Sequence, residues 1–398
     1  MGKYLKYAAV IAGAALLALA CVGCGGSGGS SSKAASSASA SSSAAQTQAA
    51  KDAANVDKLI ADIQVQEWTP ETAAQCKAAK DAWDALSDEA KKLVKEADYF
   101  ALDTGSASAD DPLNGDEIGQ NEILVVSFGT SFNDSRAQDI GGIEKAIAAA
   151  NPDWSVRRAF TAQIINNHIL ARDGVAIDNV KQALDRAVAN GVKKLVIQPT
   201  HLMHGAEYDE LVAATKDYEG KLNIKIAEPL LGEVGADAKA INEDKKAASE
   251  AVVAEAVKSA GYGSLQTAKD NGVAFVLMGH GTSHEAKVTY SQMQAQMDAL
   301  GYDNVFIGTV EGEPEDTACS AVIDKVKKAG YKTVILRPLM VVAGDHANND
   351  MADPEDKESW FSQFTASGAF DKVDCQIEGL GRIPAIEKMY VAHTAAVL

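Results

Sequence analysis

An internal repeat constrains the fold more than any other feature of this 398-residue sequence. Residues 127–131 align without a gap with residues 279–283, and both segments end in Gly-Thr-Ser. Residues 197–205 align in the same way with residues 336–344, which keeps one proline and one glycine in step. Because the two copies keep their order along the chain, we expect two structural units built on the same plan.

Within each copy, apolar runs typical of buried strands alternate with helical patterns. Strands are predicted at residues 123–128, 154–160, 194–197 and 224–226, and again at 273–278, 305–310, 333–336 and 373–377. Helices are predicted at residues 142–150, 180–189 and 209–218, and again at 291–300, 321–329 and 384–396. Such alternation forms parallel sheets covered on both faces. The sequence therefore predicts an α/β fold of two similar doubly wound parallel-sheet domains, residues 121–265 and 266–398, related by a pseudo-twofold axis with a cleft between them.

Residues 1–24 have the features of an export signal. A short positive region precedes an apolar run at residues 8–20 that is too short to span a bilayer. The run ends in Leu-Ala-Cys, which resembles a bacterial lipobox, so Cys21 is the predicted lipidation site. Cys24 and an ordinary cleaved signal peptide are the alternatives. We expect an exported lipoprotein, anchored by its lipid on the outer face of the cytoplasmic membrane.

Two further segments precede the repeat. Residues 25–52 are almost entirely Gly, Ser and Ala, which predicts a flexible tether because such a segment buries little surface. Residues 53–120 are predicted to form a small helical segment and a linker. Within it, Thr69 and Ser87 are candidate helix N-caps, and residues 103–121 are rich in Asp, Gly and Ser. No chemistry is assigned to either segment.

Charge and cysteine content exclude several classes of protein. A formal net charge of −18 argues against a nucleic-acid partner, which would need clustered Lys and Arg. Cys319 and Cys375 follow no CxxC spacing, so no zinc site or disulfide framework is predicted. A single bridge between these two cysteines stays open for an oxidising compartment.

The candidate chemistry lies in three polar residues that follow predicted strands. His280 follows the strand at 273–278, Glu311 follows the strand at 305–310, and His346 lies beyond the strand at 333–336. In an open α/β sheet, ligands bind at the carboxyl ends of the strands. Two imidazoles and one carboxylate, with open positions left over, suit Co²⁺, Fe²⁺, Ni²⁺ or Zn²⁺. We expect Asp345 to orient one of the histidines.

The repeat places this constellation in one unit only. Phe128 occupies the position equivalent to His280, and Glu207 the position equivalent to His346. The two copies have therefore diverged where metal ligands would stand. A polar residue at the end of a strand can also be only a satisfied structural group, and spacing alone leaves that alternative open.

Several motifs together resemble the anaerobic sirohydrochlorin cobaltochelatases, and the most specific is Ala-Gly-Asp-His at residues 343–346. The resemblance covers residue 121 to the C-terminus. It rests on residues 124–131, 158–161, 278–281, 310–312, 338–340, 343–351, 379–381 and 384–386. It implies a class II chelatase, the ATP-independent group that includes ferrochelatase, with a tetrapyrrole cleft between two α/β domains. It also implies that His280 and His346 bind the metal, with Glu311 as the accompanying carboxylate. Arg382 departs from the family, whose members often carry an acidic residue there.

The resemblance predicts an enzyme that inserts Co²⁺ into sirohydrochlorin during anaerobic cobalamin synthesis. No GxxxxGK[ST] motif for a nucleotide is found. Because tetrapyrrole precursors are made in the cytoplasm, the export signal leaves an alternative: a surface protein that transports haem, another tetrapyrrole or metal on a chelatase scaffold. A third alternative, an adhesin or structural module, covers only the helical segment. Metal selectivity and the oligomeric state, a homo-oligomer included, stay open.

Residues of the other unit are predicted to hold the macrocycle. Ser127, Thr130 and Ser131 are small polar groups at a strand end, suited to its acetate or propionate groups. His201 and His204 follow the strand at 194–197 and are expected to face the same cleft. They would contact tetrapyrrole carboxylates or bind a haem or a second metal; a plain polar cleft lining is the alternative.

Overall fold

The computed structural model describes residues 36–116 and 118–398. The predicted export signal, with Cys21 and Cys24, lies outside these residues. Among the described residues, none of the helices combines the length and apolar character that a bilayer crossing requires.

Two four-stranded parallel sheets form the centre of the molecule. Their spatial orders are β2-β1-β3-β4 and β6-β5-β7-β8, so both sheets follow the same plan. The register is also shared, because Val126 pairs with Pro199 in the first sheet and Met278 with Pro338 in the second. The strands are β1 (Asn121–Ser127), β2 (Ser155–Phe160), β3 (Lys194–Pro199), β4 (Asn223–Ile226), β5 (Val273–Gly279), β6 (Val305–Thr309), β7 (Thr333–Pro338) and β8 (Lys372–Cys375). The predicted repeat and the predicted fold class are confirmed.

Burial on both faces explains why the central strands are continuous apolar runs. In β5, Phe275 and Leu277 pack into a core that extends to β1, whereas Val276 and Met278 pack against the opposite face of their own unit. The helices of this region are α6 (Gly141–Ala150), α7 (Gln163–Asp173), α8 (Val180–Ala189), α9 (Ala206–Thr215), α10 (Glu243–Ser259), α11 (Leu265–Asp270), α12 (Val288–Ala299), α13 (Cys319–Ala329), α14 (Trp360–Ala366) and α15 (Pro384–Ala395). Of these, α7, α10, α11 and α14 are not predicted from the sequence.

Short helical turns connect these elements. They are α5 (Asn133–Ser135), η1 (Ala107–Ala109), η2 (Arg136–Ile140), η3 (Lys216–Tyr218), η4 (Glu285–Lys287), η5 (Glu315–Thr317), η6 (Ala347–Met351) and η7 (Leu380–Arg382). Two of them, η2 and η6, are π-helical. Turns of this kind are frequent at functional sites, and η6 directly follows His346.

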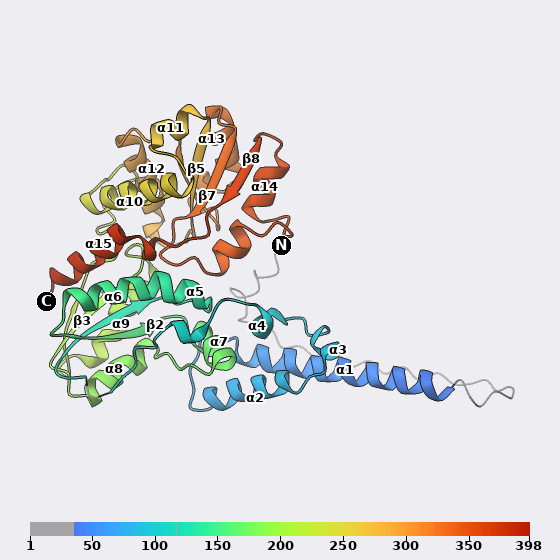
Figure 1. Cartoon of the computed structure of the whole chain (residues 1–398). Coiled ribbons are helices and arrows are strands. Elements are labelled where there is room, and N and C mark those ends of the chain that lie inside the picture. The colour runs from blue at the N-terminus through green and yellow to red at the C-terminus, as the bar shows by residue number, and fades with distance from the viewer. Residues whose placement is uncertain (1–35, 117) are drawn as a thin grey trace.

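Two helices pack across the boundary that the sequence places at residue 265. The C-terminal helix α15 packs on α6 and β3 of the first unit, whereas α10 packs on α12 of the second (Figure 1). The hydroxyl of Tyr390 in α15 donates to the carbonyl of Thr200 at 2.9 Å, and Thr394 donates to the side-chain carbonyl of Gln198 at 2.8 Å. These contacts join the two units through one shared core.

The predicted N-terminal helical segment is present, with two corrections. It consists of α1 (Ser36–Ile63), α2 (Thr72–Asp84), α3 (Asp88–Lys91) and α4 (Asp98–Ala101). Residues 36–52 are helical rather than a tether, because alanine has the highest helix propensity of all residues. Thr69 does not cap α2, which begins three residues later, whereas the Ser87 side chain accepts from the amide of Ala90 at the start of α3.

The helical segment is docked on α7 of the first unit (Figure 1). Cys76, Trp83 and Ala171 share one small apolar cluster, and the Tyr99 ring stacks on the His168 ring with centroids 3.9 Å apart. The thiols of Cys76, Cys319 and Cys375 are free, so the bridge left open by the sequence is not formed.

Candidate active site

His280 follows β5, and the backbone holds it beside the loop that follows β6. Gly281 has a φ of +92°, in the left-handed region that favours glycine. A Cβ atom here would lie 2.9 Å from Cβ of Glu311 and 3.2 Å from Cβ of Thr309, which is too close. The amide of Glu311 donates to the carbonyl of His280 at 2.9 Å. The structure thus places His280 and Glu311 on adjacent loops in direct backbone contact.

His346 reaches the same place from the segment beyond β7. Its ring centroid lies 4.6 Å from that of His280, and the two ring planes are inclined by 75°. The chain therefore brings together two histidines that are separated by 66 positions (346 − 280) in the sequence. Both come from the second unit, which agrees with the divergence of the repeat.

Hydrogen bonds fix which nitrogen each imidazole presents. Nδ1 of His280 lies 2.7 Å from the carbonyl of Gly281, and because a carbonyl only accepts, this nitrogen carries the proton. Nδ1 of His346 lies 2.7 Å from a carboxylate oxygen of Asp350. Each ring therefore keeps Nε2 for a metal, the usual arrangement when the other nitrogen bonds to a carbonyl or carboxylate.

The orienting carboxylate is Asp350, not the predicted Asp345. Asp345 instead accepts a hydrogen bond of 2.7 Å from the side-chain amide of Asn349. Asp350 stands four residues after His346, and the helical turns formed by residues 345–351 bring the two side chains together. A spacing of four residues brings two side chains together on a helix, so the sequence could have indicated Asp350 as the partner of His346.

The surroundings of His346 favour positive charge. Burial lowers the pKa of His346, but the hydrogen bond and charge of Asp350, together with the charges of Asp345 and Glu311, raise it above its ordinary value. A site that stabilises a proton in this way also stabilises a divalent cation that replaces the proton.

The third predicted ligand is near the histidines but is not in a preformed triad. Within residues 36–116 and 118–398, no three His, Cys, Asp or Glu side chains are arranged to hold a metal ion. His280 and His346 form a pair, and Glu311 contributes charge and backbone contact. Ligation by all three residues stays a prediction.

Ser127, Thr130 and Ser131 of the first unit form hydrogen bonds with other residues of the protein. Ser127 and Thr200 are buried, and their hydroxyl oxygens lie 2.6 Å apart. The hydroxyl of Thr130 accepts from the amide of Phe132 at 3.1 Å, and the carbonyl of Ser131 accepts from Arg172 at 2.6 Å. Their predicted contacts with the macrocycle stay predictions.

His201 and His204 have different surroundings. Both ring nitrogens of His201 are buried without a hydrogen-bond partner, and burial lowers its pKa to about 4, against the opposing charge of Glu207. His201 is therefore neutral at neutral pH. Nε2 of His204 instead lies 2.6 Å from a carboxylate oxygen of Glu228, and its ring contacts Tyr208.

Sequence reasoning missed a buried carboxylate that connects the two units. Asp139 in η2 accepts from the amide of Ala343 at 2.9 Å and from Nε of Arg382 at 2.5 Å. Arg382, the departure from the family pattern, therefore joins the units. Phe128, which the repeat sets opposite His280, leaves 49% of its surface exposed after β1.

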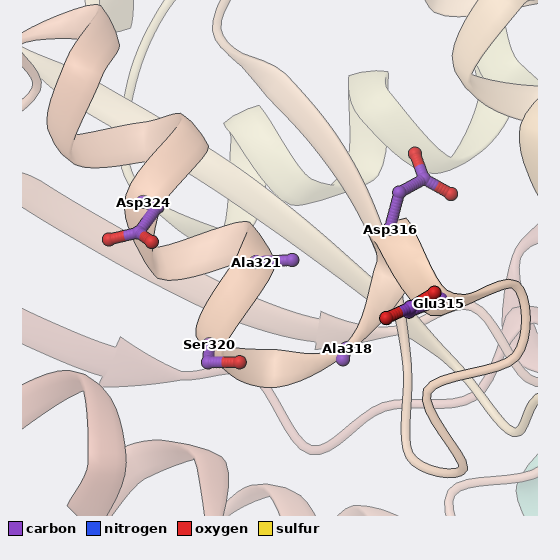
Figure 2. A pocket seen from close by; sticks show the side chains of 6 residues that line it. All are labelled: Glu315, Asp316, Ala318, Ser320, Ala321 and Asp324. Carbon is purple, nitrogen blue, oxygen red and sulfur yellow. The ribbon is translucent and has the colours of Figure 1, made fainter.

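A hollow of about 720 Å³ lies elsewhere, at the start of α13 (Figure 2). It is lined by Glu315, Asp316, Ala318, Ser320, Ala321 and Asp324. Asp316 is paired with Lys325 at 2.9 Å. The hollow contains none of the predicted site residues, and we assign it no chemistry.

The sequence comparisons identify a family of chelatases. The sequence profile of the cobalt chelatase family (CbiK) matches residues 121–398. The sirohydrochlorin cobaltochelatase of Salmonella typhimurium is 34% identical over 271 residues, which cover 68% of this chain and 94% of that protein. The sirohydrochlorin cobaltochelatase CbiKC of Nitratidesulfovibrio vulgaris is 30% identical over 249 residues, 62% of this chain and 80% of that protein. The crystal structure of the sirohydrochlorin chelatase SirB from Bacillus subtilis subspecies spizizenii in complex with cobalt aligns over 70% of this chain and 94% of its own, with a TM-score of 0.44 and 14% identity.

Proposed function

This chain belongs to the cobalt chelatase family, and from that membership we propose that it is an ATP-independent sirohydrochlorin cobaltochelatase of anaerobic cobalamin synthesis. One observation carries the assignment to this site: His280 and His346 meet with their Nδ1 atoms occupied, which leaves two Nε2 atoms for Co²⁺. The metal is a substrate of the reaction and not a resident cofactor.

The residues present suit the exchange of protons for a metal. Insertion forms bonds from Co²⁺ to the macrocycle nitrogens and releases two pyrrole protons. The two imidazoles would deliver the ion, and the charges of Asp350 and Glu311 would hold it until transfer. Once the ion has left, His346 can accept one of the protons, because its pKa lies above that of an ordinary imidazole, and the other proton passes to solvent water.

Insertion is tested by mixing the protein with sirohydrochlorin and Co²⁺ and following the absorbance of the tetrapyrrole. His280→Ala and His346→Ala should each abolish insertion while circular dichroism shows an unchanged fold. His393→Gln is the matched control, because His393 lies in α15 and pairs with Asp244, and this variant should keep activity. Near-wild-type turnover in either of the first two variants contradicts the proposed site.

The same experiment separates catalysis from transport. A transport protein on this scaffold would bind the tetrapyrrole without inserting metal, so binding with no insertion by the wild type would favour that alternative. The pair of His280 and His346, with the carboxylates around it, supports metal insertion, because simple capture of a macrocycle does not require such a site. The pairing of His204 with Glu228 offers no support for haem at that residue.

We also propose that the chain is exported and held at the outer face of the cytoplasmic membrane by a lipid on Cys21. The lipobox-like sequence before Cys21 supports this proposal. Metabolic labelling with a fatty acid should mark the wild type, and equal labelling of a Cys21→Ala, Cys24→Ala double variant would contradict it.

A further inference from the structure

The N-terminal extension, residues 36–116, lies outside the family match, yet its turn η1 contacts α5 of the first unit. The amide of Asp134 donates to the carbonyl of Thr104 at 2.8 Å, and the side-chain amide of Asn133 donates to the carbonyl of Gly105 at 3.1 Å. Gly105 has a φ of +92°, and a Cβ there would overlap the Asp134 carboxylate. The segment after α4 is therefore fitted closely against α5 and is not a free linker.

Asp110 is the main anchor of this segment. Its side chain is only 6% exposed and accepts from Nε of Arg136 at 2.7 Å and from both terminal nitrogens of Arg158, at 2.6 and 2.9 Å. Burial raises the pKa of Asp110, but the two arginines more than offset this and keep it below its ordinary value. Arg158 has a second carboxylate partner, Glu144. Among the described residues, Arg136 forms its ion pair with Asp110.

Arg136 connects Asp110 to the turn formed by α5 and η2. It is fully buried and donates to the carbonyl of Thr130 at 3.2 Å and to the side-chain carbonyl of Asn133 at 2.5 Å. Removing the charge of Asp110 would leave the guanidinium of Arg136 buried and uncompensated, which is strongly destabilising unless Arg136 moves. The position of the turn thus depends on the extension.

The turn formed by α5 and η2 is hydrogen-bonded to the segment that carries His346. The hydroxyl of Ser135 donates to the carbonyl of Ala343 at 2.7 Å, and the amide of Ala343 donates to Asp139 at 2.9 Å. A Cβ atom at Gly344 would lie 2.9 Å from the hydroxyl oxygen of Thr130. Both polar groups of the Ala343 backbone are therefore held by the turn, three residues before His346.

We propose that Asp110 is a positioning residue for His346, which acts through Arg136 and the turn formed by α5 and η2, so that the N-terminal extension completes the metal-handling site. The proposal rests on the proposed function for the meaning of that site. It gives the extension a task in catalysis that the family match does not include.

The test compares Asp110→Asn with Asp116→Asn in the full chain. Asp116 lies in the same segment and pairs with Arg186 at 2.7 Å, but its side chain is 65% exposed, which makes it a matched control. Co²⁺ affinity is measured without tetrapyrrole from the visible absorption of the bound ion. Asp110→Asn should weaken Co²⁺ binding by roughly tenfold, the lower range for residues that orient metal ligands, and Asp116→Asn should leave it unchanged.

Hydrogen exchange separates positioning from general destabilisation. In Asp110→Asn, peptides covering residues 341–351 should exchange faster, whereas peptides covering β6 should keep the wild-type rate. Unchanged Co²⁺ affinity, or faster exchange spread equally over β6, would overturn the proposal. Because neither measurement uses sirohydrochlorin, absence of insertion by the wild type would defeat the proposed function and leave this test intact.

Ser135→Ala keeps the proposal falsifiable if Asp110→Asn does not fold. This variant removes only the hydroxyl that donates to Ala343 and should weaken Co²⁺ binding in the same direction. Residues that act through one connected network have non-additive effects. Wild-type Co²⁺ affinity in Ser135→Ala would overturn the proposed path. Where Asp110→Asn does fold, strictly additive effects of the two substitutions on Co²⁺ affinity would overturn it as well.

Discussion

A single carboxylate decides which nitrogen of His346 is presented to a metal. The sequence could indicate His280 and His346 because both follow buried strands, whose carboxyl ends meet at one edge of a sheet. It could not decide between Asp345 and Asp350, because that choice depends on the helical turns of residues 345–351. Asp139 escaped prediction for a similar reason: its partners lie in the other unit, far along the chain.

Asp350→Asn should move the pH dependence of Co²⁺ binding towards lower pH. The charge of Asp350 raises the pKa of His346, so wild-type His346 keeps its proton to a higher pH, and Co²⁺ must displace it. The amide oxygen of Asn can still accept from Nδ1, but it contributes no charge. Titrations of Co²⁺ affinity against pH check this, with Asp316→Asn, in the hollow at α13, as control. An identical midpoint for Asp350→Asn and wild type would contradict it.

At the scale of elements, the strands were predicted well and several helices were not. The central strands β1 and β5 are buried on both faces and therefore leave continuous apolar runs in the sequence. The helix α7 leaves no such signal, because its buried face includes Gln163, Asn166 and Asn167. Asn167 donates to the carbonyl of Ile63 in α1 at 2.9 Å, a contact that only the fold reveals.

Gly281→Ala should disable the site through the loop after β5. The added Cβ would lie 2.9 Å from Cβ of Glu311, and the φ of +92° adds strain of about 1–3 kcal/mol. Misplacement of a reacting group by about 1 Å can reduce a rate by roughly a hundredfold, so we expect kcat/KM for cobalt insertion to fall by about that factor.

Gly301→Ala provides the control for this prediction. Gly301 also has a positive φ, of +72°, but a Cβ there would meet nothing within 4 Å. This variant should lower stability by about 1 kcal/mol and leave kcat/KM unchanged. Equal loss of activity in the two variants would mean that backbone strain, and not the contact with Glu311, is responsible.

At the scale of the whole molecule, the two units share one core, and the helical segment packs on the first unit. The sequence predicted the two sheets and the helical segment, because each depends on local periodicity. It did not predict that α15 and α10 pack across the unit boundary, or that residues 103–116 lie against the first unit. Ion pairs contribute to these contacts: Asp110 with Arg136 joins residues 103–116 to the first unit, and Asp139 with Arg382 joins the two units. Charged residues carry no hydrophobic period, so their burial is invisible in the sequence.

Acid should loosen the docking of the helical segment on α7. Burial and the charges of Arg172 and Arg136 lower the pKa of His168 to about 4, from 6.5, although the carbonyl of Tyr99 and the charge of Asp173 oppose the shift. Above pH 6.5 the docked and undocked states are both neutral at His168. As the pH falls below 6.5, the undocked state, in which Tyr99 no longer covers the His168 ring, takes up the proton more readily than the docked state, so docking weakens.

His168→Phe isolates this effect, because it keeps an aromatic ring against Tyr99 and removes the titrating group. Hydrogen exchange of α2, which contacts α7, gives the opening free energy at pH 7 and at pH 4.5. Wild type should lose more opening free energy than His168→Phe between these two values, because carboxylates elsewhere titrate alike in both proteins. Equal losses would show that His168 does not control docking.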